Sequence, residues 1–220
     1  MLHHNERRLR VIAAEHSADS PRTFMSYAMD TAVGTEMLLR TEGYQPVRHF
    51  YHMVRDTLEE ISIPRLPAGL EVRPALPEHF RPIWDAEQEA YQDLWGYSPG
   101  SEDYYQHWLH SPGFDPSLWR IAWEGEQVVG QVRSFIRPQE NEEHHRLRGY
   151  TENISVRRPW RNRGVARALI GLSLQAIKER GMTEAALQVD SDSPDGAPRL
   201  YEACGFQVVK RSSQYRKPMD

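Results

Sequence analysis

The stretch Arg157-Arg158-Pro159-Trp160-Arg161-Asn162-Arg163-Gly164-Val165-Ala166 carries most of the information about the fold of this 220-residue chain. It follows a strand-like segment, residues 150–156, and opens a segment, residues 163–180, whose apolar residues recur at helical spacing. The first turn of such a helix presents N–H groups without helical partners and the positive end of the helix dipole. Gly164 would let an anion approach the backbone closely, and the four arginines add positive charge. The sequence therefore predicts an anion-binding turn at residues 161–166.

The spacing of this turn also fits an ordinary strand–helix connection whose arginines are solvated. Spacing alone does not separate the two interpretations, and the choice between them depends on the rest of the chain.

Around the turn, strand and helix patterns alternate, which is typical of a mixed α/β fold. A break at residues 61–69, punctuated by two prolines and a glycine, predicts a linker. Residues 124–126 predict a hairpin turn, and residues 139–146 a charged loop. We expect strands at 70–73, 118–123, 127–136, 150–156, 185–189 and from Phe206, and helices at 77–95, from Ser101, at 163–180 and ending at Cys204.

Two short motifs resemble those of a known family. Arg161-x-x-Gly164-x-Ala166 matches the acyl-CoA loop pattern R/Q-x-x-G-x-G/A, and Leu200-Tyr201-Glu202-x-x-Gly205-Phe206 matches a closing LYE-x-x-GF motif. The segment from residue 70 onward thus resembles a complete domain of the GNAT superfamily, which we place at residues 70–220. The resemblance implies an α/β GNAT fold, with a mixed, twisted and splayed sheet flanked by helices. It also implies direct transfer of an acetyl group from acetyl-CoA to an amine of a small molecule or peptide.

The resemblance further implies which residues bind acetyl-CoA and assist the transfer. The strand that ends at Val156 would hold the pantetheine arm, and Tyr201 would donate a proton to the leaving sulfur. Many relatives have an asparagine shortly before the LYE helix, whereas this chain has Ser193, which lacks the two-sided reach of an amide. The residues expected to bind the cofactor are Ile154, Ser155, Val156, Arg161, Asn162, Arg163, Gly164, Val165, Ala166 and Ser193.

The first 60 residues resemble only the closing half of such a domain. Residues 38–48 and 200–210 align at the offset of 162 that separates Gly43 from Gly205, and each reads as a helix end, a glycine and an aromatic entering a strand. Chance is the alternative, because that pattern is common. We expect a strand at 9–15, a helix at 31–42 and a strand at 45–55.

The layout is similar to that of tandem-GNAT proteins such as mycothiol synthase, with residues 1–60 as a partial, degenerate module that lacks the loop. So small a piece must pack on the complete domain or on another chain, unless the gene model has lost its start.

Two sets of residues are candidates for the acceptor side of the site. Glu152 shares the strand face of Ile154 and Val156 if the alternation is regular, and a carboxylate held there would suit a general base. A solvated edge position, or a bulge that turns the side chain outward, is the alternative. A cluster of aromatic residues in the first two helices of the domain could line a pocket or belong to the core: Tyr91, Trp95, Tyr97 and Tyr104.

Composition and charge exclude several other classes. A net charge of −4 argues against a nucleic-acid partner, and no apolar stretch approaches the ~20 residues that cross a membrane. A single cysteine, Cys204, excludes an intrachain disulfide and favours a cytoplasmic location. No metal is expected, since the adjacent His144 and His145 diverge and lack further ligands. A non-catalytic acyl-CoA-binding or interaction module is the alternative to the enzyme, and a homodimer is left open.

Overall fold

The structure, a computed structural model, describes residues 1–15, 22–193 and 195–219. None of the helices in these ranges is long and apolar enough to cross a membrane. Contacts divide the chain into two compact units: unit 1 comprises Met1–His52, Val189–Pro198 and Val208–Asp220, and unit 2 comprises Met53–Gln188 and Arg199–Gln207. The predicted division into residues 1–60, 61–69 and 70–220 rests on the family resemblance and stays a prediction.

The sheet of unit 2 is mixed, as predicted. Strands β3 (Glu71–Arg73), β4 (Trp119–Glu124), β5 (Gln127–Ile136) and β6 (Arg148–Val156) pair antiparallel in that order. Strand β7 (Glu184–Asp190) joins β6 in parallel. The predicted hairpin is confirmed, because Glu124 pairs with Gln127 across a turn in which Gly125 has a φ of 56°.

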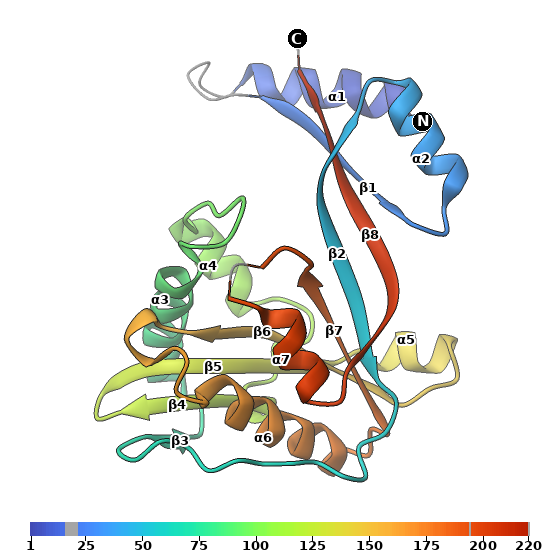
Figure 1. Cartoon of the computed structure of the whole chain (residues 1–220). Helices are drawn as coiled ribbons and strands as arrows, with labels where there is room; N and C mark the ends of the chain where they lie inside the picture. Colours follow the sequence, from blue (N-terminus) through green and yellow to red (C-terminus); the bar gives the residue numbers. More distant parts are fainter. Residues whose placement is uncertain (16–21, 194, 220) are drawn as a thin grey trace. The chain divides into compact units, whose positions relative to one another are not determined.

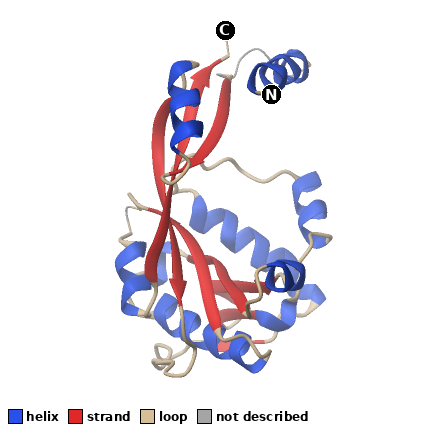
Figure 2. Ribbon diagram, turned by 90° about the vertical axis from the view of Figure 1, so that its right-hand side faces the viewer, coloured by secondary structure: helices blue, strands red, loops and turns tan. Residues whose placement is uncertain are grey.

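Helices cover both sides of this sheet (Figure 2). Successive side chains on a strand point to opposite faces, and those of β5 show which helix covers which face. Gln131 donates to the backbone oxygen of Ile83 in α3 (Phe80–Tyr91) at 3.3 Å. Ser134, three residues further on, bonds instead to Ser173 of α6 (Val165–Glu179). The two helices therefore pack on opposite faces of the sheet.

Close packing under α6 depends on two glycines. A Cβ at Gly149 of β6 would lie 2.9 Å from Cδ1 of Ile177, and a Cβ at Gly171 would lie 2.6 Å from the backbone oxygen of Ser62. These approaches bring the strand and the segment before the domain into contact with the helix. On the other face, α3 and α4 (Glu102–Leu109) cover an aromatic and aliphatic core. Its members are Ile83, Ala86, Trp119, Ile121, Trp123 and Val128, with Phe80, Trp108 and Phe114 packed against them.

Unit 1 contains α1 (Leu2–Ala14), β1 (Thr23–Met29), α2 (Val33–Thr41), most of β2 (Gln45–Arg55) and most of β8 (Gln207–Pro218) (Figure 1). Strand β8 lies between β1 and β2 and pairs antiparallel with β1. The core of this unit consists of Phe24, Ala28, Leu39, Tyr44 and Tyr215. A buried carboxylate, Glu6 of α1, accepts hydrogen bonds from the Tyr44 hydroxyl at 3.0 Å and from Nζ of Lys217 at 2.9 Å.

The structure shows the internal repeat in full. The order α1-β1-α2-β2 recurs as α6-β7-α7-β8, with α7 at Ala197–Ala203 and the offset of 162 that separates Gly43 from Gly205. Both glycines are left-handed, with φ of 85° and 87°. After each, the aromatic N–H donates to the matching helix oxygen, Tyr44 to Leu39 at 2.9 Å and Phe206 to Tyr201 at 3.0 Å. The alignment of residues 38–48 with 200–210 therefore reflects the same local fold.

Two sequence-based assignments are wrong. Residues 9–15 were expected to be a strand but belong to helix α1, whose inward face carries Glu6 while the apolar Leu9 and Val11 are exposed. The strand of this repeat is β1, which sequence patterns did not indicate. The charged loop at 139–146 contains helix α5 (Pro138–Glu143), which begins with a proline and is fixed by Asn141.

Arg55 provides a test of how this fold is held together. Its guanidinium donates to the backbone oxygens of Thr57 at 2.8 Å, Cys204 at 2.6 Å and Glu60. Replacing Arg55 by leucine leaves these oxygens without their donors, so we expect the free energy of unfolding to fall by about 1–3 kcal/mol in urea titration. The same change at the exposed Arg8 of α1 should alter it by less than about 0.5 kcal/mol. Equal stability of the two variants would contradict this role.

Candidate active site

The predicted anion-binding turn has the required backbone geometry. Strand β6 leads through the short helix η3 (Arg158–Trp160) to Gly164, which has a left-handed φ of 84° and directly precedes α6. The first helical bond of α6 runs from the N–H of Ala168 to the oxygen of Gly164, at 3.1 Å. The preceding N–H groups of the first turn therefore remain available to an anion. A Cβ at Gly164 would meet no atom within 4 Å, so the glycine is required by its φ and not by lack of space.

Most arginines of this turn bind other parts of the protein, whereas the sequence predicts that they add positive charge for an anion. Arg161 donates to the backbone oxygen of Val156 at 3.0 Å, to that of Ala90 at 2.9 Å, and to Asp93 at 2.8 Å. Hydrogen bonds from Arg158 and then Arg161 lower the pKa of Asp93 to about 2. These side chains hold the turn against the end of α3.

Arg157 pairs in the same way with Glu89 of α3, at 2.9 Å. Three of the four arginines are thus engaged by α3 and the turn after it, whereas Arg163 is exposed. The backbone N–H groups, more than the arginine side chains, make this turn suitable for an anion.

Strands β6 and β7 pair only at their beginnings. The described ladder runs from Arg148↔Glu184 to Tyr150↔Ala186, although β6 continues to Val156 and β7 to Asp190. Beyond Tyr150, one edge of β6 is therefore left for a partner other than β7. The predicted cofactor residues Ile154, Ser155 and Val156 lie on this part of the strand.

A β-bulge in β6 changes the expected position of Glu152. Pairing runs from Gln131↔Ser155 to Arg133↔Glu152, so three steps on β6 match two on β5, and Asn153 takes a φ of 51°. Paired residues share a face, so Glu152 lies on the α3 face with Ser155. The regular alternation with Ile154 and Val156 is therefore wrong, but the bulge does not turn Glu152 into solvent.

Glu152 lines a cavity of about 500 Å³ in unit 2. Three of the four aromatic pocket candidates line it as well, namely Tyr91, Tyr97 and Tyr104, whereas Trp95 does not. The other aromatic walls are Trp84, Trp108, Phe114, Trp119 and Phe135, and the other charged lining residues are Glu87, Arg133 and Arg137.

The buried charges Arg133 and Glu87 neutralise each other. Their side chains, each 5% exposed, form an ion pair. The Arg133 guanidinium carbon lies 4.9 Å from the ring centroid of Trp108 and 5.6 Å from that of Trp119. This pair fills one wall of the cavity without adding net charge.

Glu152 and two tyrosines form one electrostatic cluster. Burial raises the pKa of the Glu152 carboxyl, against a smaller opposing effect of Arg137. Burial also raises the pKa of Tyr201, with further contributions from Cys204 and Glu152. The pKa of Tyr91 lies well above its usual range because of burial, then Glu87, with Tyr201 and Glu152 contributing. The two residues predicted as catalytic, Tyr201 of α7 and Glu152 of β6, thus interact although 49 positions separate them in the chain.

Ser193 belongs to unit 1, where its N–H donates to the backbone oxygen of Asp190 at 3.2 Å. Its part in cofactor binding stays a prediction. Within the described ranges, no three His, Cys, Asp or Glu side chains gather as metal ligands.

Comparison with known proteins agrees with these features. The family model of the acetyltransferase (GNAT) family matches residues 80–206, more than half of the chain. N-alpha-acetyltransferase 30 of Schizosaccharomyces pombe is 29% identical over 117 residues, which cover 53% of this chain and 73% of that protein. Mycothiol acetyltransferase of Streptomyces scabiei is 24% identical over 212 residues, which cover 94% of this chain and 66% of that protein.

Two solved structures are also similar. The GCN5-related N-acetyltransferase from Sphaerobacter thermophilus superimposes with a TM-score of 0.83 at 28% identity, covering 99% of this chain and 66% of that one. A tandem GNAT protein from the clavulanic acid biosynthesis pathway shares the fold, with a TM-score of 0.71 at 13% identity, covering 97% of this chain and 68% of that one. The chain therefore spans about two thirds of these longer proteins.

A glutamate at Gly164 tests the anion-binding turn. We expect Gly164→Glu to abolish CoA binding in calorimetric titration while the protein stays folded, because a carboxylate would occupy the anion site. The matched control is Gly181→Glu at the other end of α6, where the glycine has a similar φ of 82° and equally open space. The control carries the same charge and backbone strain but should bind CoA normally. Unchanged CoA affinity of a folded Gly164→Glu protein would show that the turn is misassigned.

Proposed function

This chain belongs to the acetyltransferase (GNAT) family, and from that premise we propose that it transfers an acetyl group from acetyl-CoA directly to an amine of a small molecule or peptide. The observation that carries the proposal is Glu152, whose carboxyl lines the aromatic cavity with a raised pKa and contributes to raising the pKa of Tyr201. A buried carboxylate with a raised pKa and a protonated phenol are the proton acceptor and donor that such a transfer uses.

The backbone around β6 suits acetyl-CoA. The N–H groups at the start of α6 suit the pyrophosphate, and Gly164 allows the close approach that this contact needs. The edge of β6 from Ile154 to Val156 suits the pantetheine arm, since its pairing with β7 has already ended. Acetyl-CoA supplies the thioester whose acetyl group is transferred.

Glu152 suits the acceptor amine. An ammonium group is attracted both by a carboxylate and by the faces of aromatic rings, and the cavity contains both. Because its pKa is raised, the Glu152 carboxylate accepts a proton from the ammonium more readily than an ordinary glutamate does. The neutral amine can then form a C–N bond with the acetyl carbon.

Tyr201 suits the transfer of a proton to the sulfur of the departing CoA. Its hydroxyl stays protonated at neutral pH because its pKa is raised further above the usual value near ~10. As the C–S bond breaks, the phenolic proton can pass to the departing sulfur, so that CoA leaves as a thiol. The proton that the nitrogen loses as the amide forms then restores the phenol, and the first proton leaves from Glu152 to solvent.

Replacing Tyr201 by phenylalanine tests this donor. We expect kcat to fall by about 10²–10⁴ with CoA affinity nearly unchanged, since the ring is kept and only the proton is lost. Tyr105→Phe is the matched control, because Tyr105 is buried in the same unit and does not line the cavity. Steady-state rates with acceptors found in an amine panel make the comparison. If the Tyr201→Phe rate lies within about twofold of wild type while chemistry limits turnover, Tyr201 is not the donor.

The pH dependence of kcat/KM tests Glu152. A base with a raised pKa is active only when deprotonated, so activity should fall as the pH falls, with a midpoint above the ordinary value of 4.5. Glu152→Gln should lower kcat/KM by about 10²–10⁴ and remove this acidic limb. Glu143→Gln, at an exposed position of α5, should leave the profile unchanged. An acidic limb that persists in Glu152→Gln would assign the base to another group.

If the protein binds CoA but acetylates no amine in a broad panel, the proposal fails in favour of a non-catalytic acyl-CoA-binding module.

A further inference from the structure

A second charge, Arg137, lines the same cavity as the proposed base. It follows directly on β5, and its guanidinium carbon lies 5.1 Å from the ring centroid of Phe135 and 4.9 Å from that of Tyr150. These two rings are stacked, with centroids 5.1 Å apart and an angle of 11° between their planes. The guanidinium thus rests on an aromatic platform while 57% of the side chain remains exposed.

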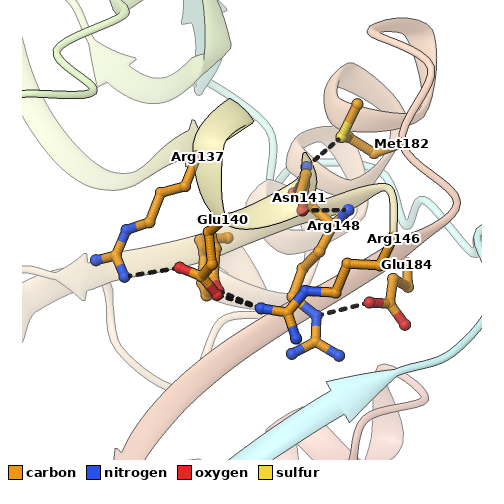
Figure 3. Close-up of polar contacts among 8 residues, drawn as sticks. Arg137, Glu140, Asn141, Arg146, Arg148, Met182 and Glu184 are labelled. Atoms are coloured by element: carbon orange, nitrogen blue, oxygen red, sulfur yellow. Dashed lines mark hydrogen bonds and ion pairs between the residues drawn. The ribbon is translucent and has the colours of Figure 1, made fainter. Parts of the chain in front are cut away.

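Hydrogen bonds hold helix α5, which begins directly after Arg137, against the sheet (Figure 3). Asn141 of α5 donates to the backbone oxygen of Arg148 at 2.9 Å and accepts from its N–H at 3.1 Å. Arg148 in turn pairs with Glu184 of β7 at 2.7 Å. Helix α5 is therefore attached to the sheet, and the position of Arg137 at its first turn is set by that attachment.

Arg137 has most of its hydrogen-bonding capacity left for a ligand. Its described ion pair is with Oε2 of Glu140, at 3.3 Å. The other oxygen of Glu140 accepts from both Arg146 and Tyr150, so this one carboxylate serves three donors (Figure 3). A guanidinium has five N–H donors in a planar fork, which matches a carboxylate in a bidentate pair.

The cavity lining therefore includes a carboxylate, Glu152, and a guanidinium, Arg137, that is near enough to lower the pKa of that carboxylate. Glu152 is suited to an ammonium group, and Arg137 to an anion, while Arg133 and Glu87 neutralise each other. The aromatic side chains that line the rest of the cavity suit an apolar body.

We propose that Arg137 binds a carboxylate of the acceptor, so that the preferred acceptors are amino-carboxylates with an apolar body, such as free amino acids with large side chains. This inference rests on the proposed function and narrows its substrate class. The inference predicts that such acceptors react better than amines that carry no anionic group near the reacting nitrogen.

The experiment compares amino acids with the amines that differ from them by the loss of the carboxylate. The pairs are L-phenylalanine with 2-phenylethylamine, L-tryptophan with tryptamine and L-leucine with 3-methylbutylamine. With the wild-type protein and acetyl-CoA, we expect kcat/KM for the amino acid of at least one pair to exceed that for its amine by about 10–100-fold, as a charge-assisted contact provides.

Arg137→Gln should reduce that ratio to near one, while kcat/KM for the amine changes less than about threefold. Arg137→Lys, which keeps the charge but not the fork, should retain part of the preference. Arg65→Gln, an exposed arginine in the same unit outside the cavity, should retain all of it. Comparing the amino-acid-to-amine ratio between variants cancels the difference in basicity between the two nitrogens.

Calorimetric binding of the amino acids to the protein without acetyl-CoA decides the matter independently of turnover. Binding that is lost in Arg137→Gln and kept in Arg65→Gln supports the inference. No measurable binding and no amino-acid preference in turnover, or a preference that Arg137→Gln leaves intact, overturns it. Amines acetylated without such a preference would overturn this inference alone, whereas failure to bind CoA or to acetylate any amine would overturn the proposed function.

Discussion

The candidate active site depends on where the parallel pairing between β6 and β7 ends. Strands β6 and β7 pair only as far as Tyr150↔Ala186, and two features follow along β6. The first is the bulge at Asn153, which carries Glu152 into the aromatic cavity on the α3 face. The second is the turn before α6, whose Gly164 exposes the first N–H groups of the helix. Both features lie on one short run of chain, between Glu152 and Gly164.

Neutralisation of the other charges is consistent with the raised pKa of Glu152 that its proposed role as a base requires. Were the guanidinium of Arg133 not paired with Glu87, it would favour an ionised Glu152 and lower its pKa. Arg158 and Arg161 are likewise engaged by Asp93, which keeps their charge at the end of α3. What remains near Glu152 is burial, which raises its pKa, opposed by the more exposed Arg137. The loop arginines thus support the chemistry indirectly, by holding the turn.

Local signals predicted much of the fold, and long-range contacts account for what they missed. The bounds of β5, the glycine stop after α2 and the helix that follows the turn come from periodicity and from residues adjacent in sequence, whereas the bounds of β2 come from the family resemblance. Helix α1 was mistaken for a strand, because its buried face is made by Glu6, whose partners Tyr44 and Lys217 are distant in the sequence. The bulge at Asn153 could not be predicted either, since it is defined by register against β5. The motif indicates Tyr201 and the strand pattern indicates Glu152, but the cavity that Glu152 lines and its electrostatic coupling to Tyr201 required the fold.

The arrangement of strands in unit 1 explains why a half-length repeat without its own loop is structurally useful. In the repeat, β1 and β2 of the first copy correspond to β7 and β8 of the second copy. Yet β1 and β2 are not neighbours, because β8 lies between them, and β2 in turn lies between β8 and the end of β7. The contact of β2 with the end of β7 is seen in the N–H of Ser191, which donates to the backbone oxygen of His49 at 3.0 Å. Strand β8 of the second copy thus lies between the two strands of the first copy, and β2 of the first copy lies between the two strands of the second. Removing β2 would leave the end of β7 and one edge of β8 without backbone partners in this unit, and with them the turn that carries Ser193. The first repeat therefore contributes a strand to this unit, and that contribution does not need a loop of its own.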